Sequence, residues 1–394
     1  MQKKLIALAV AGLASSAALA QSNVTIYGIV DVAYTHSSSG SSKTTGIDSG
    51  GWSSSRIGFR GTEDLGDGLK AIFTLEYGIT PDVNSGIGPA SGAAPLGSSR
   101  QTWVGLQNNS GSIKVGRQNT LGKVYTDKYD PMASTTFSPL YALQRGNGVG
   151  TQSAPAAGSA QPYALQTVNG RFSNAVTLES AKMSGFVISA QFAFNGQDSP
   201  VTTPVQTIPV ALDTGAKGGA VTKKQTDIAI GVEYTDGPLA LNVAHQRARD
   251  ILDVAGNKAS ENWMAAAYDF GVAKLMGSYQ TVQRTQTGVK FNTDKLVSMG
   301  VQVPVTAISK FYFGYAKATD SSAAHNDVGS WGIQYSHDLS KRTMLYGGYQ
   351  HVSNDNAASL SVLPNTGGRA AVVSKALGGS GNATGYGFGV RHTF

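Results

Sequence analysis

Arginines at alternate positions of short apolar segments are the residues of this chain best suited to chemistry. In residues 55–61 the apolar Ile57 and Phe59 share one parity and two arginines share the other. Successive side chains of a β-strand point to opposite faces, so these arginines lie on the polar face. Arg100 and Trp103 have opposite parity in the next such segment, so Arg100 lies on its polar face in the same way. The arginines assigned to polar faces are Arg56, Arg60, Arg100 and Arg171.

One acidic residue, Glu76, follows the same rule. The apolar residues that set the parity are Phe73, Leu75 and Tyr77 beside Glu76, and Phe172, Val176 and Leu178 beside Arg171. Fixed guanidinium groups near a carboxylate can steer anions and orient dipolar solutes. The spacing leaves open whether these charges form one cluster or are solvated separately at different heights.

The sequence shows no recognised catalytic or metal-binding pattern. The histidines are His36, His245, His325, His337, His351 and His392, and no two are spaced like ligands on one element. Residues 385–389 resemble a nucleotide-binding glycine loop, but no helix follows to hold a phosphate. The chain contains no cysteine, which excludes disulfides and thiolate catalysis. We therefore predict no enzymatic activity, no catalytic residue, no metal site and no cofactor.

Alternation of apolar and polar residues predicts strands along most of the chain. Ile228, Ile230, Val232 and Tyr234, for example, fall on one face of a strand, whereas a helix would spread them around its axis. We count about sixteen strands of ~10 residues, the length that a tilted membrane-spanning strand requires. They begin near Val24, Ser54, Leu69, Arg100, Ser112, Arg171, Phe186, Thr226, Leu239, Asn262, Val272, Lys295, Ser309, Gly329, Thr343 and Thr384.

Short turns and long polar connections alternate between these strands. The long connections cover about residues 119–170, 196–225 and 354–381, and the first includes a low-complexity stretch at 146–167. A soluble sandwich does not usually segregate its loops in this way. The pattern predicts an all-β fold, a sixteen-stranded antiparallel transmembrane β-barrel with short periplasmic turns and long extracellular loops.

The faces of such a barrel are inverted relative to a soluble protein, because the apolar face meets lipid and the polar face meets the lumen. Sixteen strands enclose a lumen too wide for side chains to fill, so it holds water. An arginine facing lipid at mid-membrane costs about 2–4 kcal/mol, so we expect all four arginines to face the lumen.

The composition and the first residues of the 394-residue chain indicate export. Residues 1–20 have a basic start, an apolar middle and an Ala-Leu-Ala ending, which predicts a signal peptide cut after Ala20. We expect residues 21–394 to form one barrel with no further domain. The formal net charge of +7 is too mild to indicate nucleic-acid binding.

Several segments resemble the Gram-negative general porins of the β-proteobacterial type. They are residues 24–31, residues 55–76, residues 115–118 and the final Phe394. The resemblance implies a homotrimer in the outer membrane of a Gram-negative bacterium, with the third long loop folded into each channel. It places Arg56, Arg100 and Arg171 on the barrel wall, Glu76 near them, and Asp127 and Asp130 in the infolded loop.

The resemblance also implies a function and partners. It predicts a general diffusion porin that passes ions and small hydrophilic solutes, with a weak preference for anions. The alternatives are a channel for one class of substrate and a structural or adhesive surface barrel. The expected partners are outer-membrane lipid, lipopolysaccharide and the barrel-assembly machinery.

The end of the chain predicts an assembly signal. Tyr386, Phe388 and Phe394 lie on the apolar face of the last predicted strand. Aromatic side chains on that face form the girdle of a membrane barrel at the membrane interface. The resemblance gives the same three residues a role in assembly.

Deletion of Phe394 should lower the fraction of protein inserted into outer membranes far more than it changes the conductance of any pore that does form. The physical reason is that its ring closes the last strand at the membrane boundary. Quantifying inserted protein in membrane fractions checks this, and insertion at the parental level would contradict it.

Overall fold

The computed structural model describes residues 23–39, 42–82, 99–145, 170–194, 226–249, 258–286, 289–290, 293–319, 321, 327–355, 362 and 381–394. The predicted signal peptide at 1–20 and the low-complexity stretch at 146–167 lie outside these residues. The helices are α2 (Leu121–Tyr129) and α3 (Pro139–Arg145). The strands are β1 (Asn23–Ser39), β2 (Ser42–Ser49), β3 (Arg56–Gly66), β4 (Leu69–Gly78), β5 (Ser99–Asn108), β6 (Gly111–Asn119), β7 (Arg171–Ser180), β8 (Phe186–Phe194), β9 (Thr226–Asp236), β10 (Leu239–Arg249), β11 (Lys258–Asp269), β12 (Lys274–Gln286), β13 (Val289–Lys290), β14 (Asp294–Thr306), β15 (Ser309–Thr319), β16 (Val328–Asp338), β17 (Thr343–Asn354) and β18 (Asn382–Thr393).

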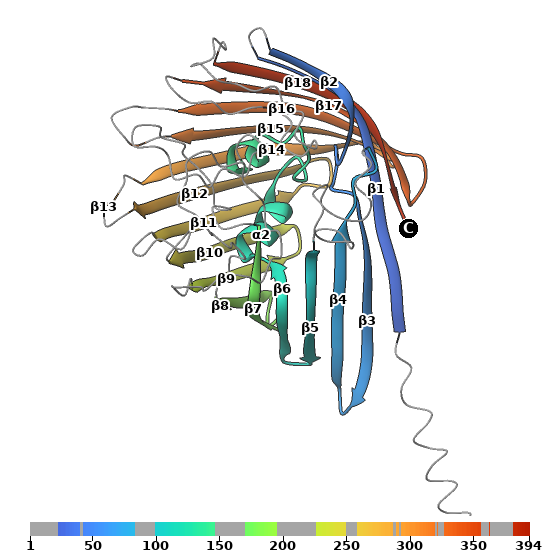
Figure 1. Cartoon of the computed structure of the whole chain (residues 1–394), viewed down its shortest axis with the longest axis vertical. Coiled ribbons are helices and arrows are strands. Elements are labelled where there is room, and N and C mark those ends of the chain that lie inside the picture. Colours follow the sequence, from blue (N-terminus) through green and yellow to red (C-terminus); the bar gives the residue numbers. More distant parts are fainter. Residues whose placement is uncertain are drawn as a thin grey trace, which may run out of the picture.

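These strand segments form one closed antiparallel barrel with sixteen strand positions in its wall (Figure 1). Each position is called a stave and contains one or two of the segments. The first half of β1 pairs with β3 and its second half with β2, so β2 and β3 are two parts of one stave. The two-residue β13 pairs with the end of β12 and leads into β14, so it extends that stave. Pairing of β18 with β1 closes the ring. The predicted fold class and number of strands are confirmed.

The two faces of the wall carry opposite kinds of side chain, as the alternation predicted. On β14, Val297 and Met299 are exposed on the outside while Ser298 between them is buried toward the lumen. Ser298 bonds Ser278 of β12 across the lumen face at 2.7 Å. None of the helices in the described part of the chain is long and apolar enough to cross a membrane.

An aromatic seam on the outer face covers the joint between the first and last staves. The backbones of Gly28 and Phe394 exchange two hydrogen bonds of 3.1 Å. The Phe394 ring lies over Gly28, where any side chain would collide with it. Further along the seam Phe388 stacks on Tyr34 at 5.2 Å, and Tyr386 packs against His36 at 5.1 Å between ring centroids. All three residues of the predicted assembly signal therefore contact β1 at the point of closure.

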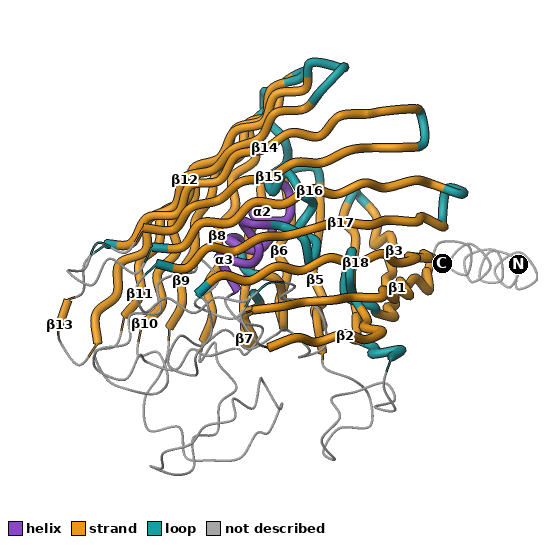
Figure 2. The backbone as a smooth tube through the Cα atoms, turned by 90° about the horizontal axis from the view of Figure 1, so that it is seen from above, coloured by secondary structure: helices purple, strands orange, loops and turns teal. Residues whose placement is uncertain are grey.

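The described part of the third loop, residues 120–145, folds into the barrel, as the family resemblance implied. Its described part holds α2 and α3, which lie inside the arc of strands in both views (Figures 1 and 2). α2 contacts β9 to β12 and α3 contacts β15 to β17. The loop therefore leaves the wall at β6 and crosses to the far side of the lumen.

A lane of glycines on the far wall receives the third loop. Gly300, Gly314 and Gly332 are register partners on three neighbouring strands, β14, β15 and β16. A side chain at any of these positions would collide with Pro131, Met132 or the Phe137 carbonyl of the loop. The absence of side chains lets the loop backbone approach the wall closely.

Three glutamines bordering this lane hold the loop by hydrogen bonds. The Gln302 amide donates to the Pro131 carbonyl at 3.0 Å, and the Gln350 amide donates to the Ser138 carbonyl at 2.8 Å. Gln334 accepts a bond from the Thr135 hydroxyl. Glycine contact and amide bonds together fix the position of the loop in the lumen.

Replacing Gly332 with Leu should displace the third loop without preventing barrel closure. The new side chain meets the Phe137 backbone, which no side-chain rotation can relieve, and overpacking of this kind costs about 1–3 kcal/mol. We expect larger single-channel conductance and faster proteolysis of the loop in a barrel that is still resistant to dissociation by detergent.

Gly329→Leu on the same strand is the matched control, because no atom lies within 4 Å of the added carbon there. Unchanged conductance in Gly332→Leu, or an equal change in both variants, would show that the glycine lane does not hold the loop.

Candidate functional site

Glu76 is the centre of a charged cluster on the lumen wall. The Arg100 Nε atom donates to its Oε1 at 2.7 Å, and an Nη1 atom of Arg56 lies 3.8 Å from its Oε2. The Tyr27 hydroxyl donates to Oε2 at 3.1 Å. Glu76 itself is only 4% exposed, whereas both arginine side chains keep some contact with the lumen. One carboxylate is thus shared between two guanidinium groups.

The register of three strands builds this contact. Tyr27 of β1 pairs with Gly58 of β3, and Gly58 pairs with Glu76 of β4. Because Gly58 has no side chain, the Tyr27 ring lies across it and its hydroxyl reaches the carboxylate on the second strand over. The same ring carries the Arg60 guanidinium, 5.2 Å from its centroid. Arg60 therefore faces the lumen near Arg56, as its parity predicted.

Arg100 reaches the lumen through a β-bulge rather than through its parity. Trp103 faces the lumen, where Lys114 lies 5.7 Å from its ring centroid, and the outward positions of β5 are Val104 and Leu106. The expectation that Trp103 faces lipid is therefore wrong. Gln101 and Ser99 pair with the consecutive Glu76 and Tyr77, which leaves Arg100 as the extra residue between them. A bulge re-aims a side chain in this way.

A second bulge changes the interpretation of Arg171. Phe172, expected on the lipid face, is fully buried on the lumen side with Ala175, Ala193 and Ala248. The register shifts here, and Asn174 has a left-handed φ of 51°. The alternation of Val176 and Leu178 therefore does not extend to Arg171. Arg171 begins β7 opposite Asn119, and Glu76 makes its ion pairs with the other two wall arginines.

The two acids of the third loop differ in their surroundings. Asp127 on α2 is half-exposed, pairs with Lys123 at 2.8 Å, and acts electrostatically on Arg56 across the lumen. Asp130 is buried, and it accepts bonds from the backbone of Met132 and Ser134 and from the Ser138 hydroxyl. Asp127 therefore faces the wall arginines, whereas Asp130 organises the loop and does not line the open lumen.

Burial raises the pKa of Asp130 to about 6, although the three donated hydrogen bonds oppose the shift. The charge of this carboxyl therefore changes between mildly acidic and neutral pH.

Sequence reasoning missed a second carboxylate group in the lumen. Asp31 of β1 accepts the backbone N–H groups of Trp52 and Ser53 at 3.0 and 2.7 Å and a bond from the Tyr346 hydroxyl. Arg391, its register partner on β18, donates to the Ser53 hydroxyl at 3.0 Å. These contacts hold the inward excursion at residues 50–55 between β2 and β3. Asp31 has the same parity on β1 as Tyr27, which faces the lumen. This shared parity was the sequence signal that could have identified Asp31.

The excursion also meets the third loop. The Thr136 backbone N–H donates to the Gly51 carbonyl at 3.0 Å, and the Trp52 ring packs edge-on against Tyr312 and Tyr346 at about 5.5 Å. Within the described ranges no group of histidines and acids is arranged to hold a metal ion. The site is therefore a set of fixed charges around a passage, not a catalytic constellation.

Comparison with known proteins agrees with this description. A family model described as Gram-negative porin matches residues 7–357. Outer membrane porin protein 32 of Delftia acidovorans is 31% identical over 401 residues, covering 100% of both chains. An outer membrane porin protein of Bordetella pertussis is 28% identical over 400 residues, covering 88% of this chain and 93% of that protein. The structure of the anion-selective porin from Comamonas acidovorans matches with a TM-score of 0.72 and 29% identity, covering 95% of this chain and 100% of that one.

A closed barrel whose outside is apolar and whose lumen carries fixed charges is a transmembrane channel of the outer-membrane class. The chain belongs to the Gram-negative porin family. It is an outer-membrane channel without enzymatic activity, which confirms the class, the location and the family that the sequence indicated.

Asp130 should make the stability of the folded protein depend on pH. Its pKa is raised from 3.8 to about 6, so the native state binds more protons than the unfolded state between these values. Its contribution to stability is therefore complete below about pH 4 and is lost as the pH rises through about 6, by about 1.4 kcal/mol per pH unit between the two pKa values. Unfolding by heat in micelles, measured from pH 4 to 8, reports this slope.

Asp130→Asn should flatten that slope, and Asp127→Asn, one helical turn earlier, should keep most of it, because the Asp127 charge is the smallest cause of the raised Asp130 pKa. The same pH dependence in Asp130→Asn as in the parent would mean that another group causes it.

Proposed function

We propose that the chain is a general diffusion porin with a weak preference for anions and that the Arg56–Glu76–Arg100 cluster forms the narrow part of its channel. The observation that carries the proposal is the sharing of a single carboxylate between two partly exposed guanidinium groups. Glu76 can balance only one of the two charges. The excess positive charge faces the third loop, where the half-exposed Asp127 shares its charge with Lys123 and so offsets the wall only in part.

Nearby groups add to the positive balance. Arg60 lies over the Tyr27 ring, where an aromatic face stabilises the cation without neutralising it. Asp31 lies opposite its register partner Arg391, so these two charges offset one another and leave the excess of the cluster unchanged. Fixed charges of one sign in a water-filled passage raise the local concentration of counter-ions. The name of the Comamonas relative, an anion-selective porin, supports the same direction.

The opposing charges of the wall and the loop also create a transverse field. Arg56 and Arg100 lie on the wall and Asp127 lies on α2, so the field between them aligns the dipole of a solute that passes through. Such a field discriminates by charge and dipole rather than by a specific shape. This is the behaviour of a general channel, and it separates this proposal from a channel for one substrate.

The partners that we propose are two further copies of the chain and lipopolysaccharide. The trimer rests on family membership, and cross-linking of the purified protein tests it. For lipopolysaccharide the support is a basic belt on the outer face, at the end of the barrel remote from the chain terminus. The belt comprises Arg247, Arg249, Lys258, Lys295 and Lys317. Phosphates of the outer leaflet would match these charges, and loss of co-purifying lipopolysaccharide in Arg249→Ser with Lys258→Ser tests the match.

Replacing both Arg56 and Arg100 with Ala should move the reversal potential in a salt gradient toward cation preference. A unit charge about 8 Å from an ion contributes roughly 0.5 kcal/mol even in bulk water, so the ratio of anion to cation permeability should fall about twofold or more. Planar-bilayer recordings of the parent and the double variant measure this ratio.

The matched control removes two positive charges from the outer belt, Arg249→Ala with Lys258→Ala, where screening over ~8 Å at physiological salt isolates them from the channel. The control should leave the reversal potential unchanged. An unmoved potential in the lumen variant, or a parent that strongly prefers cations, would refute the proposed role of the cluster.

A further inference from the structure

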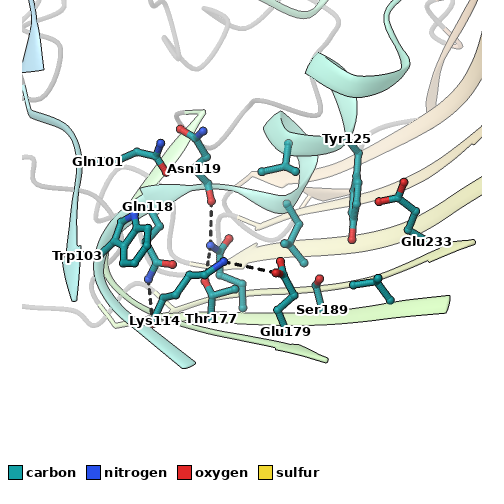
Figure 3. A pocket seen from close by; sticks show the side chains of 14 residues that line it. Gln101, Trp103, Lys114, Gln118, Asn119, Tyr125, Thr177, Glu179, Ser189 and Glu233 are labelled. Carbon is teal, nitrogen blue, oxygen red and sulfur yellow. Dashed lines mark hydrogen bonds and ion pairs between the residues drawn. The ribbon is translucent and has the colours of Figure 1, made fainter. Parts of the chain in front are cut away.

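A pocket of about 130 Å³ lies between α2 and the lumen face of strands β5 to β9 (Figure 3). Its wall is a continuous patch, because Lys114, Thr177 and Gln191 are register partners on neighbouring strands. Gln101 on its rim pairs with Glu76, so the pocket adjoins the charged cluster without including it. Nothing in the proposed passage of ions requires this pocket.

Two glycines shape the pocket around two aromatic rings. A side chain at Gly116, whose φ is 135°, would collide with the Thr102 carbonyl and the Trp103 Cα atom, so glycine lets β6 lie close against β5 beside Trp103. A side chain at Gly231 would collide with the Tyr125 ring of α2. The pocket therefore has an aromatic side on the wall and a second aromatic on the loop that covers it, as Figure 3 shows.

The charges around the pocket are already balanced. Lys114 lies 3.5 Å from Glu179 and also over the Trp103 ring. Glu233 is paired with Lys128 of α2 and accepts a bond from the Tyr129 hydroxyl at 3.3 Å. A ligand with net charge would have to break one of these pairs, which disfavours ions in the pocket.

Two acceptors of the lining remain without a hydrogen bond in the described part of the chain. They are the side-chain oxygens of Asn119 and Gln191, both shielded from water. The Gln191 amide nitrogen is occupied, because it donates to the Asn119 carbonyl and to the Thr177 hydroxyl at 2.9 Å each. An unsatisfied buried acceptor is costly, so a ligand O–H group that reaches either oxygen as its amide rotates toward the pocket would be favoured.

We propose that this pocket is a binding subsite for neutral, polyhydroxylated, ring-shaped solutes of monosaccharide size. An enclosed apolar cavity of about 150 Å³ holds one benzene ring. The pocket has about 130 Å³ and is open on one side, so a sugar ring can enter it with some of its hydroxyl groups outside. The Trp103 face covers the C–H side of the ring, and the amides and carboxylates accept from its hydroxyls. This subsite rests on the proposed function as a diffusion channel, and it adds a preference among neutral solutes that the charged cluster does not provide.

The test is binding of glucose to the full-length protein, refolded in micelles and followed by saturation-transfer NMR. Trp103→Ala should weaken glucose binding by roughly tenfold through loss of the aromatic face, and Trp103→Phe should keep most of it. Gln191→Leu should weaken binding while leaving Trp103 in place. Trp331→Phe, on the outer face, is the control and should bind like the parent.

Glycine serves as the competing ligand, since a zwitterion would use the Lys114–Glu179 pair instead of the amides and the indole. Binding of glycine without glucose, no glucose binding by the parent, or equal glucose binding by all four variants would each overturn the subsite.

Single-channel recordings on the same preparations separate this result from the proposed function. A parent that conducts ions but does not bind glucose overturns the subsite alone. A parent that binds glucose through Trp103 and Gln191 but does not conduct overturns the diffusion channel and supports a binding barrel with this subsite.

Discussion

The pairing of β18 with β1 is the interaction on which the rest of this structure depends. A bilayer core offers no water to an exposed N–H or C=O group, so spanning strands are stable only when every stave has two neighbours. The aromatic seam of Phe394, Phe388 and Tyr386 over β1 protects the joint at which this condition is met. Closure also fixes the lumen: a ring of sixteen staves is too wide to be filled by its own side chains.

A wide lumen makes the third loop the element that determines what can pass. Its helices pack into a buried apolar cluster with side chains of the far wall, such as Trp263, Leu296 and Tyr312. Glycines admit the segment between the helices, and glutamines on the wall satisfy its carbonyl groups. Docking of this loop creates two different surroundings. The charge of Asp127 acts on Arg56 of the wall, and Tyr125 covers the pocket beside Trp103.

The charged cluster depends on small irregularities in the wall. Gly58 lets Tyr27 cross a strand to reach Glu76, and the bulge at Arg100 turns a side chain inward that regular alternation would send into lipid. Gly58 lies on β3, which also carries Arg56 and Arg60, and the bulge lies on β5 where it pairs with β4. The side chains that face the membrane therefore alternate regularly, whereas the irregular positions turn side chains into the lumen. Only the lumen side can accommodate a bulged residue without exposing its charge to lipid.

The sequence by itself determined the class of fold, the number and approximate starts of the strands, and the residues of the closing seam. It could do so because period-two alternation is a local property that each strand shows independently of its neighbours. It also found Arg56, Arg60 and Glu76, which lie on regular stretches of β3 and β4. Family resemblance supplied the infolded loop.

Only the tertiary structure decided the orientations of Trp103 and Phe172, because each depends on the register of a strand against its partner and a single extra residue reverses the parity beyond it. It also decided that Asp130 is buried while Asp127 is not, since two acids on one short segment are distinguished only by how the loop folds against the far wall. The contact between Asp31 and Trp52 and the pocket beneath α2 are products of distant segments, and no local pattern encodes them, although parity alone places Asp31 on the lumen face.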